Sequence, residues 1–582
     1  MKDLRFSAGG APDTCEFDVA ICGGGMAGLT LARQLRREQP QARVAVLDRL
    51  TRPLPEAAFK VGESTVELAG YYLRDMLGLA DYLDRAHLRK LGIRMYFPPA
   101  RGDGTDFASR PEVGLSMFAT VPAHQIDRGR FEHDLREMIL DDGVTLIEGA
   151  RIDAVTLGEA GAPHTVSFYH GADEQPTSLT CRWVVDAAGR QRMLQRQLGL
   201  GHRREADHNA VWFRADGRVD VEDLVPAANR AWHDRVPGNK RWFATCHLVG
   251  KGYWVWVIPL KGDRTSIGIV ADRNLHPIEG YQSMDRARAW LAQREPALAR
   301  RLEDFAIMDF GLIRNYSHTS HRVMSADRWA CTGDAGVFAD PLYSPGSDMI
   351  AFANSCISWM VGQDLDGRLT PELAEEKSRF IISLGELLTR SIQTNYQLLG
   401  SAQAMGAKLF WDFTAGWAVV QPLMFGKGFL DTRAHAEVRA ATRQFFFLSL
   451  QVNQMFLDWA ERGGARAGYD YIDYLTVDAI RDMRARNLIP DKPIPDLVAD
   501  ARENMGLMEE LANAIFRIAV ADVLPDRLDQ IEGKWLNPYA ISLDPATWEE
   551  RGLFRPRTAP RDTARMTEQL GRLFGVPLRV PA

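Results

Sequence analysis

Short apolar runs and a helical pattern follow one another at the start of the chain. Residues 17–22, FDVAIC, form an apolar run that is typical of a buried strand. Residues 29–37 carry their apolar positions on one face of a helix, and residues 43–47 form a second apolar run that ends in Asp48. Strand, helix and strand in this order predict the opening βαβ unit of a parallel sheet.

The stretch WVWVIP, residues 254–259, has the strict alternation of a strand. Trp254 and Trp256 alternate with valines, so both indoles are expected on one face of that strand. Aromatic side chains bury large areas wherever they lie, so packing in a core is one interpretation. The other interpretation is that the two indoles form the wall of a site.

Strand-like stretches continue over residues 195–320, whereas helical spacing dominates from Pro371 onward. A chain of 582 residues is too long for a single core, so more than one domain is expected. The aromatic residues of the helical part are predicted to be core residues; they are Phe445, Phe446, Phe447, Phe456 and Trp459.

Charge and cysteine content exclude several classes of protein. The formal net charge is -6, which gives no indication of a nucleic acid partner. The six cysteines include no C-x-x-C pair, so a disulfide scaffold or a metal site is not expected, and a reducing, cytoplasmic location fits. No run approaches about eighteen consecutive apolar residues, so no membrane span is expected.

The first strand and helix enclose the pattern G-x-G-x-x-G at Gly23, Gly25 and Gly28. Glycines let the backbone approach a pyrophosphate, and the N-terminus of the helix offers free N–H groups and a positive dipole. Asp48 follows Gly28 by 20 residues, which is the spacing of a carboxylate that binds a ribose. We therefore expect a dinucleotide at this end of the sheet.

Two later segments indicate that the dinucleotide is FAD. RWVVDAAGRQR, residues 182–192, and the segment from Arg328 that contains Gly333 and Asp334 are similar to the second and third nucleotide motifs of the flavoproteins with two dinucleotide-binding domains. The resemblance implies that Asp334 contacts the ribityl chain. It also implies that Arg128 lies near the flavin, although a solvated charge at the start of a helix is an alternative for this residue.

Three segments narrow the resemblance to one family. WVWVIP matches the W-x-W-x-I-P motif of the flavin-dependent halogenases. FKVGEST, residues 59–65, is similar to the segment that lies over the flavin in that family, with Gly62, Glu63 and Ser64. Lys90 follows Glu63 by 27 residues, close to the position of the family's essential lysine. The chain resembles the phenol and carrier-protein types of halogenase more than the tryptophan type.

The resemblance implies halogenation of an electron-rich aromatic ring, phenolic or pyrrolic, in natural product biosynthesis. Reduced FAD (FADH2), dioxygen and chloride or bromide would give hypohalous acid, and Lys90 would guide this acid as a hydrogen-bond donor or as a haloamine. Trp254 and Trp256 would keep the substrate away from the flavin, and Glu63 completes the catalytic candidates. For Lys90 the alternative is a charged residue that caps an amphipathic segment.

The implied partners are a separate flavin reductase and an aromatic substrate, either free or bound to an acyl carrier protein. An external reductase fits because the chain has no second G-x-G-x-x-G for a nicotinamide cofactor. Neither nucleic acid nor a metal ion is an expected partner.

One position departs from the halogenase pattern. In that family the backbone N–H groups of two consecutive loop residues hold the halide, and here the first of them is Pro345, which has no N–H. Gly346 and Ser347 remain as halide-binding candidates. The departure favours an alternative, an FAD-dependent aromatic monooxygenase on a halogenase-like scaffold. A further alternative is a flavin-binding protein without turnover that acts as a partner in a biosynthetic complex.

These observations predict an α/β fold that is α+β overall. We expect a Rossmann-like FAD-binding domain over residues 15–365, with an antiparallel β-sheet on the substrate side inserted at about residues 195–320. Residues 366–582 are expected to form a helical C-terminal domain that covers the active site.

Overall fold

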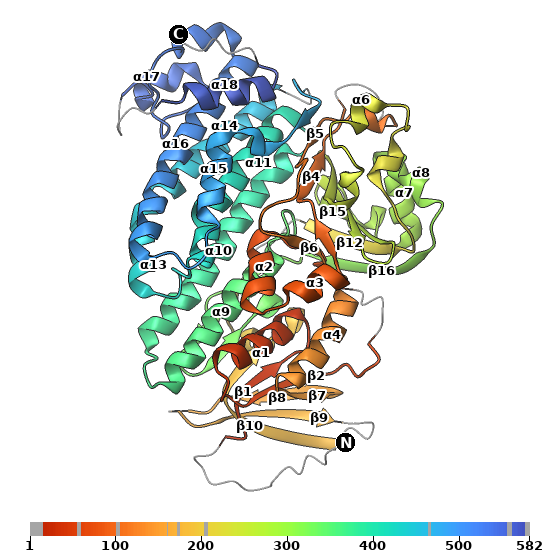
Figure 1. Cartoon of the computed structure of the whole chain (residues 1–582), viewed down its shortest axis with the longest axis vertical. Helices are drawn as coiled ribbons and strands as arrows, with labels where there is room; N and C mark the ends of the chain where they lie inside the picture. The colour runs from red at the N-terminus through yellow and green to blue at the C-terminus, as the bar shows by residue number, and fades with distance from the viewer. Residues whose placement is uncertain are drawn as a thin grey trace.

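The computed structural model of the chain consists of two large β-sheets with a helical part beside them (Figure 1). The glycine motif belongs to the first sheet, the WVWVIP strand belongs to the second, and long helices fill most of the C-terminal third. Phe59 of the FKVGEST segment lies outside the described residues. The residues that the structure describes are 15–54, 60–99, 105–159, 161–170, 175–202, 208–463, 467–555 and 562–576.

The glycine motif belongs to the first sheet, whose central strands are parallel. Its strands are β1 (Phe17–Cys22), β2 (Val44–Asp48), β7 (Thr145–Glu148), β8 (Ala150–Thr156), β9 (His164–His170), β10 (Gln175–Asp186), β18 (Met324–Ser325) and β19 (Trp329–Cys331). The order is β18-β19-β10-β1-β2-β7, and the pairs from β19 to β7 are parallel, as their buried apolar runs require. The predicted βαβ unit is confirmed, although its helix α1 (Met26–Glu38) begins before residue 29.

Two further helices pack against α1 at this sheet. They are α4 (Arg128–Asp141) and α9 (Gly346–Leu365). The α4 helix begins after Asp127, whose carboxylate accepts hydrogen bonds from the Gly129 and Arg130 backbone N–H groups. The α9 helix begins directly after Pro345, so the loop that departs from the halogenase pattern leads into the N-terminus of a 20-residue helix.

The second sheet collects strands from three distant parts of the chain. In spatial order they are β16 (Ile307–Arg314), β12 (His208–Ala215), β15 (Arg264–Asp272), β14 (Tyr253–Leu260), β13 (Thr245–Gly250), β4 (Ile93–Tyr96), β5 (Glu112–Val113) and β20 (Tyr471–Ile472). The strands from β16 to β13 are antiparallel neighbours and come from the region 195–320. The remaining three come from outside that region, and β20 belongs to the C-terminal third. Every residue of β12, β13 and β14 is buried, so the sheet is covered on both faces.

The C-terminal third is mainly helical and lies along one side of both sheets (Figure 1). Its helices are α10 (Pro371–Leu398), α11 (Ala402–Ala415), α12 (Gln421–Phe425), α13 (Thr432–Thr442), α14 (Phe445–Gly463), α15 (Asp478–Asn487), α16 (Ile494–Val523), α17 (Trp548–Arg551) and α18 (Ala564–Leu573). Thr370 caps α10, and Pro371 occupies the first turn, where its missing N–H costs nothing. The long α16 packs against α13, α14 and α18.

The aromatic cluster of α14 is only partly a core. Phe445, Phe456 and Trp459 are buried, as predicted. Phe446 and Phe447 are 45% and 58% exposed, so the prediction is wrong for these two residues. Successive residues of a helix point about 100° apart, so three consecutive phenylalanines cannot all face the same core.

Three further observations concern the chain as a whole. Within the described ranges, no helix has both the length and the apolar character that are needed to cross a membrane. All six cysteines are free thiols. Among the same residues, no group of histidine, cysteine and carboxylate side chains is arranged to hold a metal ion.

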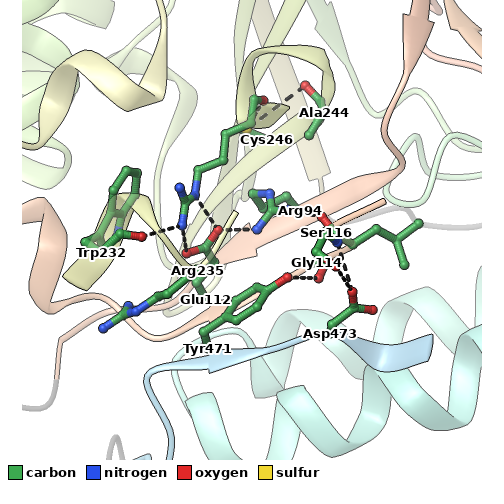
Figure 2. A network of polar contacts seen from close by, with 12 residues as sticks. Arg94, Glu112, Gly114, Ser116, Trp232, Arg235, Ala244, Cys246, Tyr471 and Asp473 are labelled. Atoms are coloured by element: carbon green, nitrogen blue, oxygen red, sulfur yellow. Dashed lines mark hydrogen bonds and ion pairs between the residues drawn. The ribbon is translucent and has the colours of Figure 1, made fainter. Parts of the chain in front are cut away.

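A buried ion network joins the C-terminal third to the second sheet (Figure 2). Glu112 of β5 accepts hydrogen bonds from Arg94 of β4 and from Arg241, and none of these three side chains is exposed. Burial by itself raises the pKa of Glu112, but the two guanidinium groups outweigh burial and lower it. Beside this group, the Tyr471 hydroxyl donates to the Gly114 carbonyl oxygen at 3.1 Å. These contacts fix β5 between β4 and β20.

Removing the carboxylate from this network is expected to destabilise the fold. Glu112→Ala leaves Arg94 buried without a counter-ion and leaves Arg241 with Glu222 alone, at 3.5 Å, which should lower the free energy of unfolding by about 3–5 kcal/mol. Thermal unfolding followed by circular dichroism measures the change. As a control, Asp470→Asn alters an exposed carboxylate beside Arg235 and should change stability by less than ~0.5 kcal/mol. Equal melting temperatures for the two variants would contradict this account.

Candidate functional site

A cavity of about 510 Å³ is lined by residues of both sheets and of the loops between them. Of the residues that the sequence singles out for the site, Gly28, Lys90 and Pro345 do not line it. Those that do are Gly23, Gly25, Asp48, Gly62, Glu63, Ser64, Arg128, Trp254, Trp256, Gly333, Asp334, Gly346 and Ser347. Motifs that are hundreds of residues apart in the chain therefore meet around one space.

The glycine motif forms one end of this cavity. A Cβ atom on Gly23 would collide with the carbonyl oxygen of Ala187, and a Cβ atom on Gly28 would collide with the carbonyl oxygen of Gly23. The α1 helix begins directly after Gly25, which offers no side-chain cap. Backbone that only glycine permits, followed by a helix N-terminus, is a cradle that fits a pyrophosphate.

Asp48 lies at the end of β2 on the cavity wall. Its carboxylate accepts hydrogen bonds from the buried Arg136 and, at 3.2 Å, from the Leu50 backbone N–H. No sequence motif points to Arg136. The two contacts fix the carboxylate beside the cradle, where the spacing from Gly28 predicts a ribose.

Arg128 is held by buried contacts at the start of α4. Its side chain is 13% exposed, Nη1 donates to the Val61 carbonyl oxygen at 2.8 Å, and Nη2 donates to Glu132 at 2.6 Å. The alternative of a solvated charge is therefore wrong. Glu132 also accepts from the Met26 backbone N–H at 3.1 Å and from Lys60, so one carboxylate joins α4, the first turn of α1 and residues 60–65 of FKVGEST, called the V-G-E segment below.

Asp334 follows Gly333 in the loop after β19 and lines the cavity. Burial raises the pKa of this carboxyl, and His318 and Arg128 oppose the shift. Its side chain makes no hydrogen bond with any of the described residues. A carboxyl group on the cavity wall with free acceptor atoms suits the hydroxyl groups of a ribityl chain, so the residues of this cavity fit FAD.

Lys90 ends the short strand β3 (Leu88–Lys90), which pairs with β6 (Ala123–Gln125). Its side chain is buried, and Nζ donates at 2.7 Å both to Ser64 Oγ and to the Thr65 carbonyl oxygen. Burial lowers the pKa of Lys90 to about 7, although Glu67 and Asp348 oppose the shift. The alternative of a charged cap on an amphipathic segment is wrong, because a cap would reach solvent.

Ser64 connects Lys90 to the cavity. Besides accepting from Lys90, its hydroxyl accepts from the Ser344 hydroxyl at 2.9 Å and shares a hydrogen bond of 2.8 Å with Thr245 Oγ1. Ser64, Ser344 and Thr245 all line the cavity. The ammonium group of Lys90 is thus one hydroxyl group away from the space that fits the flavin.

The loop before α9 has an unusual backbone. Pro345 is the cap residue of the helix, so the first N–H at this end belongs to Gly346. Tyr343 and Ser344, which precede it, have φ angles of 71° and 61°, a region that residues other than glycine rarely adopt. Gly346 and Ser347 both line the cavity, as the halide prediction requires, but their role stays a prediction.

Trp254 and Trp256 project from one face of β14, with ring centroids 5.7 Å apart. Trp254 Nε1 donates to the Tyr396 hydroxyl of α10 at 2.9 Å, and Trp256 Nε1 donates to Ser266 Oγ at 3.1 Å. Both indoles are buried, and both line the cavity. The two interpretations of the WVWVIP strand, packing in a core and forming the wall of a site, therefore both fit these two side chains.

Several residues of the cavity were not predicted from the sequence. The most prominent are Trp212, Thr245, His247, Tyr316 and Asp340. Thr245 and His247 alternate along TCHLVG, so period-two spacing was an available signal for them. Asp340 is buried, and His208 together with the Tyr316 hydroxyl lowers its pKa although burial opposes the shift. Asp340 can be recognised as a cavity residue only from its contacts in the folded structure.

Comparisons with known proteins agree with this geometry. The FAD binding domain family model matches residues 16–273. The chain is 25% identical over 447 residues to the flavin-dependent halogenase chlA of Dictyostelium discoideum, and the aligned residues make up 71% of each protein. It is 26% identical over 336 residues to a 1H-pyrrole-2-carbonyl peptidyl-carrier protein brominase of Pseudoalteromonas luteoviolacea, covering 57% of this chain and 73% of that protein.

Among solved structures, halogenase PltM in complex with phloroglucinol and FAD is similar to this chain. The TM-score is 0.60 at 18% identity, over 85% of this chain and 97% of that one. At 18% identity this similarity is evidence for the fold alone. Together the comparisons confirm FAD as the cofactor, the Rossmann-like FAD-binding domain and the resemblance to flavin-dependent halogenases.

The burial of Lys90 predicts a pH-dependent stability. Between pH 7 and its ordinary pKa of 10.5, this lysine is protonated in the unfolded chain but neutral in the folded one. The folded state should therefore gain up to about 1.4 kcal/mol per pH unit as the pH rises through this window. Lys90→Met lacks that contribution. Melting temperatures of both proteins between pH 7 and pH 9 should diverge in slope, and parallel curves would show that the pKa of Lys90 is not lowered.

Proposed function

We propose that this chain, an FAD-binding protein that resembles the flavin-dependent halogenases, halogenates an electron-rich aromatic ring with chloride or bromide. The substrate would be phenolic or pyrrolic, free or bound to a carrier protein, in the biosynthesis of a natural product. The observation that carries the proposal is the buried Lys90, one hydroxyl group away from a cavity that fits FAD and is walled by Trp254 and Trp256.

When bound, reduced FAD supplies together with dioxygen the oxidising power that converts a halide into hypohalous acid. The residues of this chain would hold the cofactor at three points. The backbone at Gly23 and Gly28 would receive the pyrophosphate, Asp48 a ribose, and Asp334 the ribityl chain. Arg128 would keep the V-G-E segment over the cofactor through its bond to the Val61 carbonyl oxygen.

The halide would lie at the N-terminus of α9. The backbone N–H groups of Gly346 and Ser347 are the donors that remain after Pro345, and the positive end of the helix dipole adds to them. The loss of one charge-assisted hydrogen bond at Pro345 should weaken halide binding by about 1.5–3 kcal/mol relative to a loop with both donors.

Lys90 would bind and orient the hypohalous acid, either as a hydrogen-bond donor or as a haloamine. Its lowered pKa, about 7, supports both roles because the ammonium and the neutral amine coexist near neutral pH. Trp254 and Trp256 would separate the substrate from the flavin. Glu63, whose pKa burial raises against the pull of Arg214, would support this wall from the V-G-E segment.

The organisation of the chain would follow from this chemistry. A separate flavin reductase would deliver reduced FAD in the cytoplasm, because the chain has one glycine-rich nucleotide motif. Residues 15–365 would form the FAD-binding domain with its substrate-side sheet, and residues 366–582 would cover the site. The Tyr396 hydroxyl of α10, which accepts from Trp254, supports a direct role of the helical part in shaping the wall.

A second candidate function is hydroxylation of an aromatic ring by an FAD-dependent monooxygenase. Pro345 favours it, because a hydroxylase holds no halide and needs no N–H at that position. The two indoles of β14 oppose it, since a hydroxylase must let the substrate reach the flavin.

The decisive test is product formation by holoenzyme whose FAD has been photoreduced. The enzyme is mixed with oxygenated buffer that contains bromide, phloroglucinol and excess free methionine, which removes hypobromous acid that escapes. We expect brominated phloroglucinol by mass spectrometry. The Lys90→Ala variant should form at least ~100-fold less of this product, while bromide should still change the rate at which FAD is reoxidised. The control Lys377→Met removes a buried lysine bonded to the Phe429 carbonyl oxygen and should keep the product.

Other outcomes would change the assignment. Hydroxylated phloroglucinol that forms with or without bromide would establish the monooxygenase and refute halogenation. Reoxidation that is indifferent to bromide and chloride, without any product, would indicate a flavin-binding protein without turnover. Bromination by Lys90→Ala at the wild-type rate would remove Lys90 from the mechanism.

Restoring the missing N–H at residue 345 is expected to tighten halide binding. Pro345→Ser and Pro345→Ala both add a backbone donor, so the bromide concentration for half-maximal effect on FAD reoxidation should fall about tenfold or more. Agreement between the two variants would assign the effect to the N–H and not to the serine hydroxyl. An unchanged bromide dependence in both would contradict a halide site at this helix end.

A further inference from the structure

His247 of β13 is a buried polar side chain on the cavity wall without a hydrogen-bond partner among the described residues. It is 1% exposed, and its Nδ1 atom is fully buried and unpaired. Nε2, the ring nitrogen that a ligand in the cavity can reach, has no hydrogen-bond partner among the described residues either. Thr245, two positions earlier on the same face of the strand, is by contrast bonded to Ser64 and to Gln125. Buried polar groups in native proteins are nearly always paired, so an unpaired imidazole on a cavity wall points to a ligand.

The neighbours of His247 place it beside the indoles. Strand pairing sets it next to Trp256 of β14 on one side and Met95 of β4 on the other. Its ring centroid lies 4.7 Å from that of Trp254. None of these residues belongs to the nucleotide motifs, so His247 faces the part of the cavity that the second sheet provides.

This part of the wall is aromatic. In the sheet register, the row that begins at His247 runs through Trp256 and Gly268 to Trp212. The Trp256 indole lies over Gly268, where a Cβ atom would collide with the ring. A planar aromatic ring can lie on such a surface, and His247 is then the hydrogen-bonding group at its edge.

The imidazole is uncharged at neutral pH. Burial lowers the pKa of His247 to about 3, Lys90 acts in the same direction, and Asp340 opposes the shift. A neutral imidazole carries one nitrogen that accepts a hydrogen bond and one that donates. Its acceptor nitrogen can receive a hydrogen bond from a ring O–H or N–H. With so low a pKa it takes up the proton only once the ring has added the halogen, when that O–H or N–H becomes strongly acidic.

We propose that His247 binds the ring O–H or N–H of the aromatic substrate and takes up its proton while the ring is halogenated. This inference rests on the proposed function and adds the residue that selects the substrate class. Rings with a free hydroxyl or N–H next to the reacting carbon would be substrates, and the same rings with that group blocked would not.

The ring carbon attacks the halogen of hypohalous acid, so that a carbon–halogen bond forms, the halogen–oxygen bond breaks and hydroxide leaves. His247 holds the O–H proton while the ring carries the added halogen. The hydroxide then takes the C–H proton to give water, and His247 returns its proton to the ring oxygen. The ring carbon is oxidised and the halogen is reduced.

Binding of a matched pair of probes tests the proposal without turnover. Holoenzyme with oxidised FAD and no halide is titrated by calorimetry with phloroglucinol and with 1,3,5-trifluorobenzene, which has a similar shape but no O–H. The wild-type protein should prefer phloroglucinol. In His247→Leu, phloroglucinol binding should weaken about tenfold while trifluorobenzene binding stays unchanged, which corresponds to one hydrogen bond.

Two further variants separate binding from proton transfer. His247→Gln keeps a hydrogen-bond acceptor, so it should bind phloroglucinol nearly as the wild type does but lose at least ~100-fold of product formation. His276→Gln is the matched control, because His276 is a buried histidine that is bonded to the Lys251 carbonyl oxygen and does not line the cavity. It should preserve both binding and product.

The outcomes distinguish this inference from the proposed function. If wild-type protein does not bind phloroglucinol, or does not prefer it over trifluorobenzene, the role of His247 is refuted. It is also refuted if His247→Leu weakens FAD binding and leaves the probes unaffected, which would assign the residue to the cofactor. A wild-type enzyme that binds phloroglucinol through His247 but only hydroxylates it would refute halogenation and retain the inference.

Discussion

The site depends on the burial of one ammonium group. Lys90 has no carboxylate within ion-pair distance among the described residues, and two oxygen atoms of the V-G-E segment, Ser64 Oγ and the Thr65 carbonyl oxygen, hold it. These oxygens are positioned in turn by His124 of β6, whose backbone exchanges hydrogen bonds with Thr65. A buried charge is costly unless such contacts offset it, so the segment cannot move without leaving the lysine unsatisfied. The same contacts fix Glu63 and Ser64 at the cavity, which explains how a short segment can define the space over a flavin.

A second constraint is the pairing of tryptophan with glycine in the sheet that faces this space. The Trp256 indole lies over Gly268 and the Trp212 indole lies over Gly311, and a side chain at either glycine would collide with the ring. Residues on adjacent antiparallel strands are only about 5 Å apart, so any larger neighbour would tilt the indoles into the cavity. Glycine on the neighbouring strand thus leaves room for each of these two rings. Core packing and wall formation hold together, because Trp212 and Trp256 are buried and also line the cavity.

Sequence patterns predicted the parts of the site in which function imposes a fixed spacing along the chain. The glycine cradle, Asp48 and the tryptophan pair belong to this group, since each depends on contacts within a single βαβ unit or strand. The burial of Arg128 was undecided, because it depends on a carbonyl oxygen of a distant segment. The spacing of His247 marked only one face of a strand, and Trp212 gave no signal, because the row that joins them to the wall exists only in the register of four strands, which a single sequence does not specify. For the same reason the contribution of β20 to the second sheet was not predicted.

The loop before α9 shows how the helical third, which carries no recognisable motif, takes part in the site. Tyr343 and Ser344 adopt a left-handed backbone that costs on the order of 1 kcal/mol or more for each residue. The Tyr343 hydroxyl donates to Asp412 of α11 at 3.0 Å and accepts from Asn395 of α10 at 2.8 Å. These bonds can offset the strain only while both helices are in place. The strained turn in turn directs the Ser344 hydroxyl at Ser64, and so at the lysine. The proline that follows is therefore part of a loop that the helices hold in one conformation, and the geometry at the N-terminus of α9 is set from the C-terminal third as much as from the first sheet.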